Sequence, residues 1–115
     1  MANSNVISIT IIHNNAGLVL GFKVKNHGHP IVCSAVSALT INAVNSIESL
    51  TGLQAHNYRC KVNAPGGFIG FILKDSSFRN LGAGLLLDSL VLGLSGISHQ
   101  YPSHVSFTSK YLDRK

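Results

Sequence analysis

The chain has 115 residues and a mass of 12.2 kDa, enough for one hydrophobic core but not for two, so we expect a single domain over residues 1–115. Hydrophobic residues make up 45% and charged residues only 11%, which excludes an intrinsically disordered chain. Nine Lys and Arg against four Asp and Glu give a net charge of +5 without an aromatic-basic run, so we expect acidic surroundings and no direct nucleic-acid reader.

Two strands are predicted at the start of the chain. Every second residue of 7–11 is isoleucine, the pattern of a strand with one buried face. A turn leads to a second strand over 20–24, where apolar residues again alternate with polar ones. The same alternation predicts that Lys23, Lys25 and His27 share the open face of this strand.

A long helix is predicted next, because the hydrophobic period changes from two residues to three or four. Apolar residues at this spacing run from 32 to 50 and form a stripe along one side. Pro30 suits the first helical turn, where its missing N–H has no partner to lose. Gly52 is the expected stop.

A second hairpin is predicted from the alternation over 56–62, a turn at 64–67 and a partner strand from Phe68 to Leu73. In this pattern Cys60 alternates inward, which favours a structural thiol in the core.

The remaining chain predicts a second helix and a last strand. Residues 75–77 are expected to cap a helix that runs to about Ser98. The Leu- and Gly-rich segment 81–97 carries Asp88 at its midpoint, so we expect a core helix and no membrane span. Alternation over 105–107 predicts a short strand.

The predicted element order is therefore ββαββαβ. With two helices and about five strands, the expected fold is a two-layer α+β sandwich with both helices on one face of the sheet. The first residues show no secretory signal, and two cysteines are too few for a disulfide framework, so we expect reduced thiols and a cytoplasmic protein.

Cys33 is the candidate nucleophile, because it falls in the first turn of the first predicted helix. Unpaired N–H groups and the positive end of the helix dipole favour an anion there. Ser37 lies one helical turn further along the same face. His27 ends the preceding strand, and a histidine beside a helix-start cysteine meets the requirement for a nucleophile and its base. The same N–H groups would stabilise an oxyanion.

The run Gly-His-Pro-Ile-Val-Cys-Ser-Ala-Val-Ser-Ala-Leu over residues 28–39 resembles a known signature. It is similar to that of the ribosomal-processing cysteine protease (Prp) family, in which a Gly-His step and a loop precede Asp-Ile-Val-Cys-Ala-Ala-Val-Ser-Ala at a helix start. Residues 43–45, Ala-Val-Asn, are also similar to the family's sequence in the same helix. The order ββαββαβ matches the family's organisation from end to end.

This resemblance implies roles for individual residues. The family's nucleophile falls on Cys33, and the serine of its Val-Ser step falls on Ser37. His27 takes the place of the family's histidine if the loop is shortened here, and His29 is the alternative base. The family's aspartate is Pro30 in this chain.

The resemblance also implies an activity. Family members are cytosolic homodimers that remove the N-terminal extension of a large-subunit ribosomal protein by Cys/His acyl transfer, without a cofactor. Lys23 and Lys25, expected beside His27, would attract an acidic or polar peptide.

Two other functions remain open from the sequence. A catalytically silent homologue would bind ribosomal partners through its positive charge. A zinc-binding domain would use His27, His29 and Cys33, with His56 or Cys60 as a fourth ligand.

Overall fold

The structure, a computed structural model, describes residues 6–63 and 67–113. Its strands are β1 (Ile7–His13), β2 (Val19–Lys25), β3 (Tyr58–Asn63), β4 (Phe68–Leu73) and β5 (Val105–Tyr111). Its helices are α1 (Pro30–Leu50) and α2 (Leu81–Gln100), with short 3-10 helices η1 (Ala55–Asn57) before β3 and η2 (Asp75–Arg79) before α2. The predicted order ββαββαβ is confirmed.

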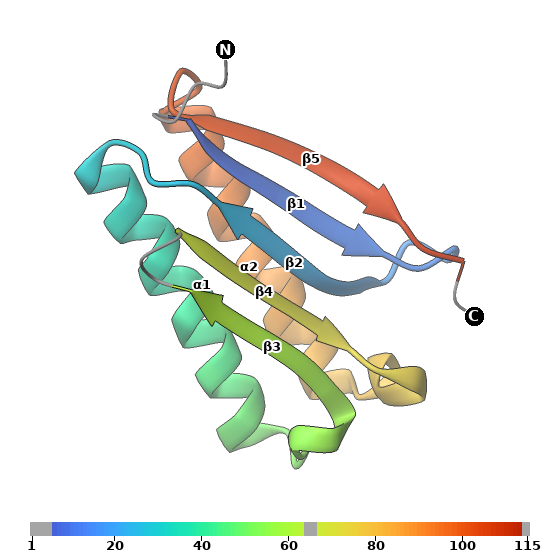
Figure 1. Cartoon of the computed structure of the whole chain (residues 1–115). Coiled ribbons are helices and arrows are strands. Elements are labelled where there is room, and N and C mark those ends of the chain that lie inside the picture. The colour runs from blue at the N-terminus through green and yellow to red at the C-terminus, as the bar shows by residue number, and fades with distance from the viewer. Residues whose placement is uncertain (1–5, 64–66, 114–115) are drawn as a thin grey trace.

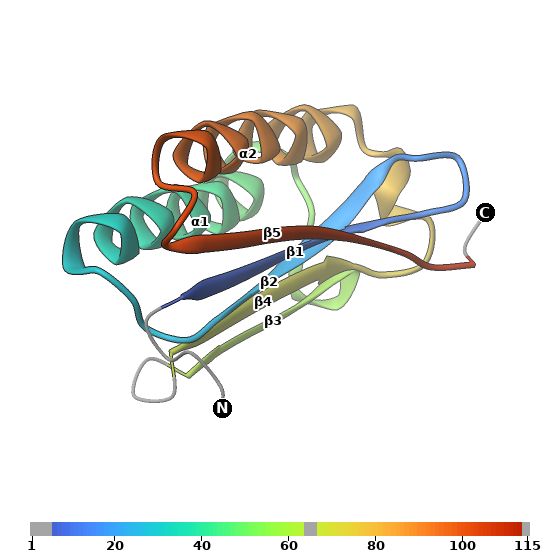
Figure 2. The same ribbon diagram turned by 90° about the horizontal axis from the view of Figure 1, so that it is seen from above.

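The strands form one mixed sheet in the order β3-β4-β2-β1-β5 (Figure 1). Neighbouring strands are antiparallel except β1 and β5, which are parallel. Figure 2 shows α1 and α2 together on one side of the sheet, which confirms the predicted two-layer α+β sandwich. We call the covered side the helix face and the other side the open face.

The hydrophobic core lies between the helices and the helix face. Ile9 of β1 is fully buried, and Phe22 of β2 stacks on Phe71 of β4 with ring centroids 6.0 Å apart. Val36 of α1 and Leu87 of α2 pack against these strand residues from the helix layer. Burial of each such side chain contributes about 1.5–3 kcal/mol to the free energy of folding. The core therefore holds α1 in a fixed position over the sheet.

Both helices are long and apolar enough to cross a membrane by length and composition, a test that core helices of soluble proteins also pass. In this fold their inner sides pack on the sheet, with Leu87 and Leu94 of α2 fully buried. Asp88 points to the exposed side of α2. One side of α2 therefore packs into the core as expected for 81–97, while Leu81, Leu85 and Leu92 on its other side are exposed.

The start of α2 differs from the prediction that residues 75–77 cap it. Those residues belong to η2, and Asn80 is the cap, because its Oδ1 accepts the Ala83 N–H at 2.9 Å. The Asn80 amide also donates to the Thr51 carbonyl at 3.1 Å, just beyond the end of α1. One side chain therefore begins α2 and ties it to α1.

The second hairpin also differs in detail. The structure places Ala55–Asn57 in η1, so β3 begins later than expected, and Cys60 is an exposed free thiol where a core position was predicted. The reason is that β3 is an edge strand, over which the helix layer gives little cover. Partial burial of the thiol, and then the nearby Glu48 carboxylate, raise the pKa of Cys60. Residues 64–66 of the predicted turn lie outside the described residues.

Candidate active site

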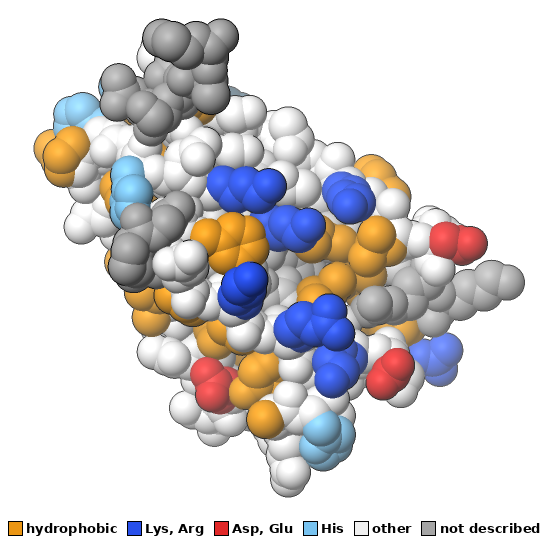
Figure 3. Space-filling view, in the orientation of Figure 1, with side chains coloured by type: hydrophobic (Ala, Val, Ile, Leu, Met, Phe, Trp, Pro, Cys, Tyr) orange, Lys and Arg blue, Asp and Glu red, His pale blue; other side chains and the backbone are white. Residues whose placement is uncertain are grey.

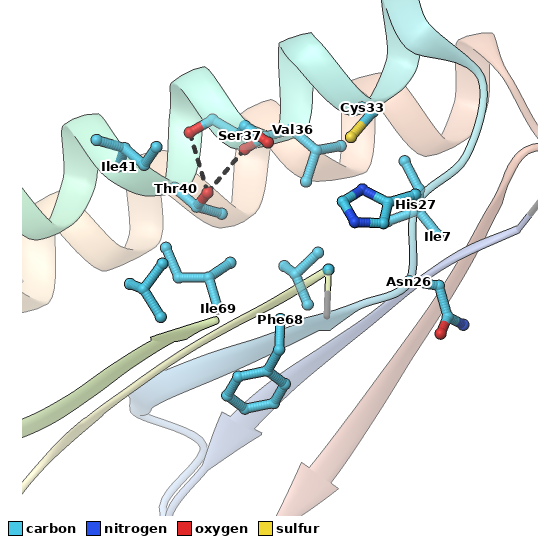
Figure 4. Close-up of a pocket in the computed structure, with 13 residues that line it drawn as sticks. Ile7, Asn26, His27, Cys33, Val36, Ser37, Thr40, Ile41, Phe68 and Ile69 are labelled. Carbon is cyan, nitrogen blue, oxygen red and sulfur yellow. Dashed lines mark hydrogen bonds between the residues drawn. The ribbon is translucent and has the colours of Figure 1, made fainter. Parts of the chain in front are cut away.

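The connection between β2 and α1 turns sharply at Asn26. Its φ of 76° lies in the left-handed region, which asparagine tolerates better than most residues. This turn interrupts the alternation of β2, so the His27 side chain lies on the helix face (Figure 4). Lys23 and Lys25 stay on the open face, opposite to the expectation that they would accompany His27.

Cys33 lies in the first turn of α1, where its sulfur points toward the end of the sheet (Figure 4). It is a free, half-buried thiol in contact with the hydrophobic core. This combination leaves the sulfur accessible while the rest of the residue is held by packing. The predicted position of Cys33 at a helix start is confirmed.

A pocket of about 140 Å³ separates the start of α1 from the ends of β2 and β4, and His27, Cys33 and Ser37 all line it. The remaining lining is mainly apolar, from Ile7, Val24, Val36, Ile41, Val62, Phe68 and Ile69. Ser37 is exposed at the pocket, and its carbonyl accepts a hydrogen bond from the buried Thr40 hydroxyl at 3.1 Å. The pocket thus combines a thiol, an imidazole and a hydroxyl with an apolar lining.

The imidazole of His27 and the sulfur of Cys33 face the same space (Figure 4). No hydrogen bond joins them within residues 6–63 and 67–113. Catalytic hydrogen bonds are often long in unliganded proteins and tighten when substrate binds. Their placement therefore suits a nucleophile and a general base that a substrate brings into contact.

The backbone at the start of α1 offers fewer free donors than expected for an oxyanion hole. Nδ1 of His29 accepts the Ile31 N–H at 3.3 Å, and the Cys33 N–H donates to the His29 carbonyl at 2.8 Å. Pro30 has no N–H. In the part of the chain that the structure describes, the Val32 N–H is the first-turn donor without such a partner, but Val32 is fully buried and does not line the pocket.

His29 is turned away from the pocket, since its ring caps α1 and packs against His104 with centroids 5.2 Å apart. The structure therefore brings His27, Cys33 and Ser37 together but leaves out His29. Among the described residues no three His, Cys, Asp or Glu side chains gather as metal ligands, so the zinc alternative has no structural support.

Gly67, just before β4, is a site residue that sequence reasoning missed. Its φ is +64°, and a Cβ placed on it would lie 2.9 Å from Cδ2 and 3.0 Å from Nε2 of His27. The His27 ring therefore rests directly on the Gly67 backbone. The Gly-Gly step of the predicted turn was the available signal, but nothing local links it to His27.

Comparison with known proteins agrees with this geometry. The model of the cysteine protease Prp family matches residues 6–106. The chain belongs to the Prp family. The resemblance seen around Cys33 is thereby confirmed. Comparison with curated proteins gives no match.

Solved structures carry the same fold. The ribosomal processing protease Prp from S. aureus, in complex with a covalently linked product peptide, is 27% identical, with a TM-score of 0.81 over 91% of this chain and 100% of that one. The same protease with a substrate peptide is 24% identical, with the same coverage and TM-score. SMU.848 from Streptococcus mutans is 22% identical, with a TM-score of 0.80 over 97% and 100% of the two chains.

Gly67→Ala tests whether the contact with His27 matters for a Prp-type site. The added methyl group needs the space of the imidazole, so we expect it to displace His27 and reduce the rate of peptide cleavage about 10- to 100-fold. The positive φ at residue 67 adds a stability cost of about 1–2 kcal/mol. Cleavage kinetics and thermal unfolding, measured on the same samples, separate the two effects.

Gly52→Ala is the matched control. Gly52 has a φ of +78°, and a Cβ placed on it would have nothing within 4 Å, so this position carries the backbone strain without the contact. We expect a similar loss of stability and an almost unchanged cleavage rate. Equal rates for the two variants would show that Gly67 does not position His27.

Proposed function

We propose that this protein is a cysteine endopeptidase that removes the N-terminal extension of a large-subunit ribosomal protein. The observation that carries the proposal is the convergence of Cys33 and His27 on one pocket in a chain of the Prp family. The similarity to a ribosomal processing protease with a covalently linked product peptide supports the same reaction type.

The proposed reaction is acyl transfer through a thioester. His27 takes the proton of Cys33, and the thiolate attacks the scissile carbonyl carbon to form a tetrahedral oxyanion. Protonated His27 then donates its proton to the leaving amine as the C–N bond breaks. His27 then deprotonates a water molecule, which attacks the thioester carbonyl, and the C–S bond breaks as protonated His27 returns its proton to the departing thiolate. The new carboxylic acid loses its own proton to the solvent.

One further group of α1 takes part in the proposed mechanism. We assign the Ser37 hydroxyl a hydrogen bond to the substrate backbone, since it stands exposed at the pocket one turn beyond Cys33.

The pocket lining favours an apolar substrate side chain beside the scissile bond. Val24, Val36 and Ile69 present aliphatic groups to it, and an apolar side chain gains free energy by leaving water for such a surface. Lys23 and Lys25 are not part of this pocket, so we do not assign them to recognition of the cleaved segment.

The experiment that tests this function is incubation of the protein with a ribosomal protein that carries its N-terminal extension. Intact-mass spectrometry should show cleavage at a single bond, with one water added across the two products. An unchanged substrate mass at neutral pH would instead support a silent homologue that binds without cleaving.

We further propose that the protein acts in the cytoplasm as a homodimer. Both cysteines are free thiols, as a reducing compartment requires. Leu81, Leu85 and Leu92 of α2 are 89%, 72% and 76% exposed and surround the exposed Asp88, a largely apolar surface that a second copy would cover.

Replacement of Leu85 and Leu92 together by lysine should convert the dimer to a monomer. In a symmetric interface each substitution occurs twice, so the two substitutions bring four lysines against the two Asp88 carboxylates. Burying this excess of positive charge is unfavourable, and we expect the dissociation constant of the dimer to rise at least about 100-fold. Size-exclusion chromatography with light scattering measures the mass directly. Leu18→Lys, at a half-exposed leucine in the β1–β2 turn, is the control that should leave the mass unchanged. A monomeric parent protein would contradict the dimer.

A further inference from the structure

The open face of the sheet gathers positive charge without acidic residues among it. Basic side chains alternate along the strands at Lys23, Lys25, Arg59, Lys61 and Lys110. None of the four acidic residues of the chain lies on a strand. Figure 3 shows Lys and Arg side chains across this face, with Asp and Glu toward its edge. Such a surface attracts a polyanion.

An aromatic ring lies among these cations. Phe68 points away from α1 (Figure 4), and its ring covers Gly70, where a Cβ would lie 2.9 Å from Phe68 Cζ. Lys23 on β2 and Lys61 on β3 both pair with Gly70 from opposite sides. Because Gly70 has no side chain, the Phe68 ring lies on the sheet between two lysines.

The surface continues into a hollow of about 300 Å³ on the same face. Arg59 and Lys110 stand at the two sides of this hollow, and Ile12 and Ile72 form its apolar floor. Cationic side chains therefore border an apolar strip that includes an aromatic ring. Phe68 also lines the pocket of Cys33, but neither the proposed peptidase reaction nor the core packing uses the cations and the hollow.

We propose that the open face binds single-stranded RNA. Lysine and arginine side chains neutralise the phosphates, and a base stacks on Phe68 between Lys23 and Lys61. Those two lysines belong to strands two positions apart, roughly 10 Å, which leaves room for a base between their phosphate contacts. Such binding depends on the phosphates and the flat faces of the bases and does not distinguish one base sequence from another. It therefore agrees with the absence of an aromatic-basic run from the sequence.

An acidic protein is less suited to this face than RNA, because carboxylates match the cations but supply no flat ring for Phe68. The choice of RNA over DNA rests on the proposed function, since a protease of ribosomal proteins works among RNA. The binding itself does not need Cys33 or His27, which lie on the helix side of the sheet, although Phe68 borders both surfaces.

Fluorescence anisotropy with labelled oligouridine tests the proposal on the intact chain. We expect binding that weakens as salt rises, with a log–log slope of about −0.7 for each phosphate contact. Lys61→Glu should weaken binding at least about tenfold, whereas Arg79→Glu, the same charge change on η2, should leave it within about twofold. Phe68→Leu keeps an apolar cover over Gly70 but removes the ring, and should weaken binding about fivefold or more.

Cys33→Ala should retain full RNA binding, so failure of this proposal and failure of the protease proposal are distinguishable. Absence of binding at low salt, or equal losses for Lys61→Glu and Arg79→Glu, would overturn the RNA proposal. Equal or tighter binding of polyglutamate of the same length would overturn it in favour of an acidic protein partner.

Discussion

Cys33→Ala is expected to abolish cleavage of the extended ribosomal protein, with kcat/KM reduced by more than about 10⁴-fold. Among the described residues, the sulfur of Cys33 is the one thiol that lines the pocket with His27. Without it no thioester forms, and binding alone cannot break the peptide bond. Cleavage is measured by intact mass over a time course, with circular dichroism to show that the variant is folded.

Cys60→Ala is the matched thiol control and should cleave as fast as the parent protein. Cys60 lies on the edge strand β3 and does not line the pocket. Partial burial and then Glu48 raise the pKa of its thiol, so less of it is thiolate at neutral pH than of an ordinary cysteine. Loss of activity in Cys60→Ala with retention in Cys33→Ala would refute the assignment of the nucleophile.

His27→Ala is expected to lower the cleavage rate about 10²- to 10⁴-fold, the usual contribution of a general base. His27 is exposed and lines the pocket, so its removal should leave the thermal stability almost unchanged. The rate is measured under single-turnover conditions, where a lost proton acceptor slows acylation directly.

His29→Ala should show the opposite pattern. Its Nδ1 accepts the Ile31 N–H at the start of α1, so we expect a stability loss of about 0.5–2 kcal/mol, seen as a lower melting temperature. The rate should change far less than in His27→Ala, because the His29 ring packs on His104 outside the pocket. A larger rate loss in His29→Ala would identify it as the base.

The elements themselves were predictable because their signals are local. Pro30 and Gly52 bound a helix whose apolar period is visible in the sequence, and α1 begins and ends where they predict. The position of Cys33 in the first turn follows from this helix alone. Alternation likewise located β1, β2 and the start of β5, since neighbouring residues of a strand point to opposite faces.

The predictions that differ from the structure depend on contacts between distant segments. Cys60 alternates inward in the sequence, yet it is exposed, because the strand order decides that β3 is at the edge of the sheet. The cap of α2 moved to Asn80, whose amide also reaches the end of α1. Neither fact can be deduced from the pattern of a single segment.

The sequence by itself determined the two-layer fold and placed a cysteine at the start of a helix. Its small share of charged residues already indicated a chain that buries much of its length in one core. Tertiary structure decided which groups meet that cysteine. The positive φ at Asn26 turns His27 to the helix face, and Gly67 from a different hairpin supports its ring. The same turn leaves Lys23 and Lys25 on the open face. Periodicity reports which side of one element is buried, whereas a site is made where several elements converge.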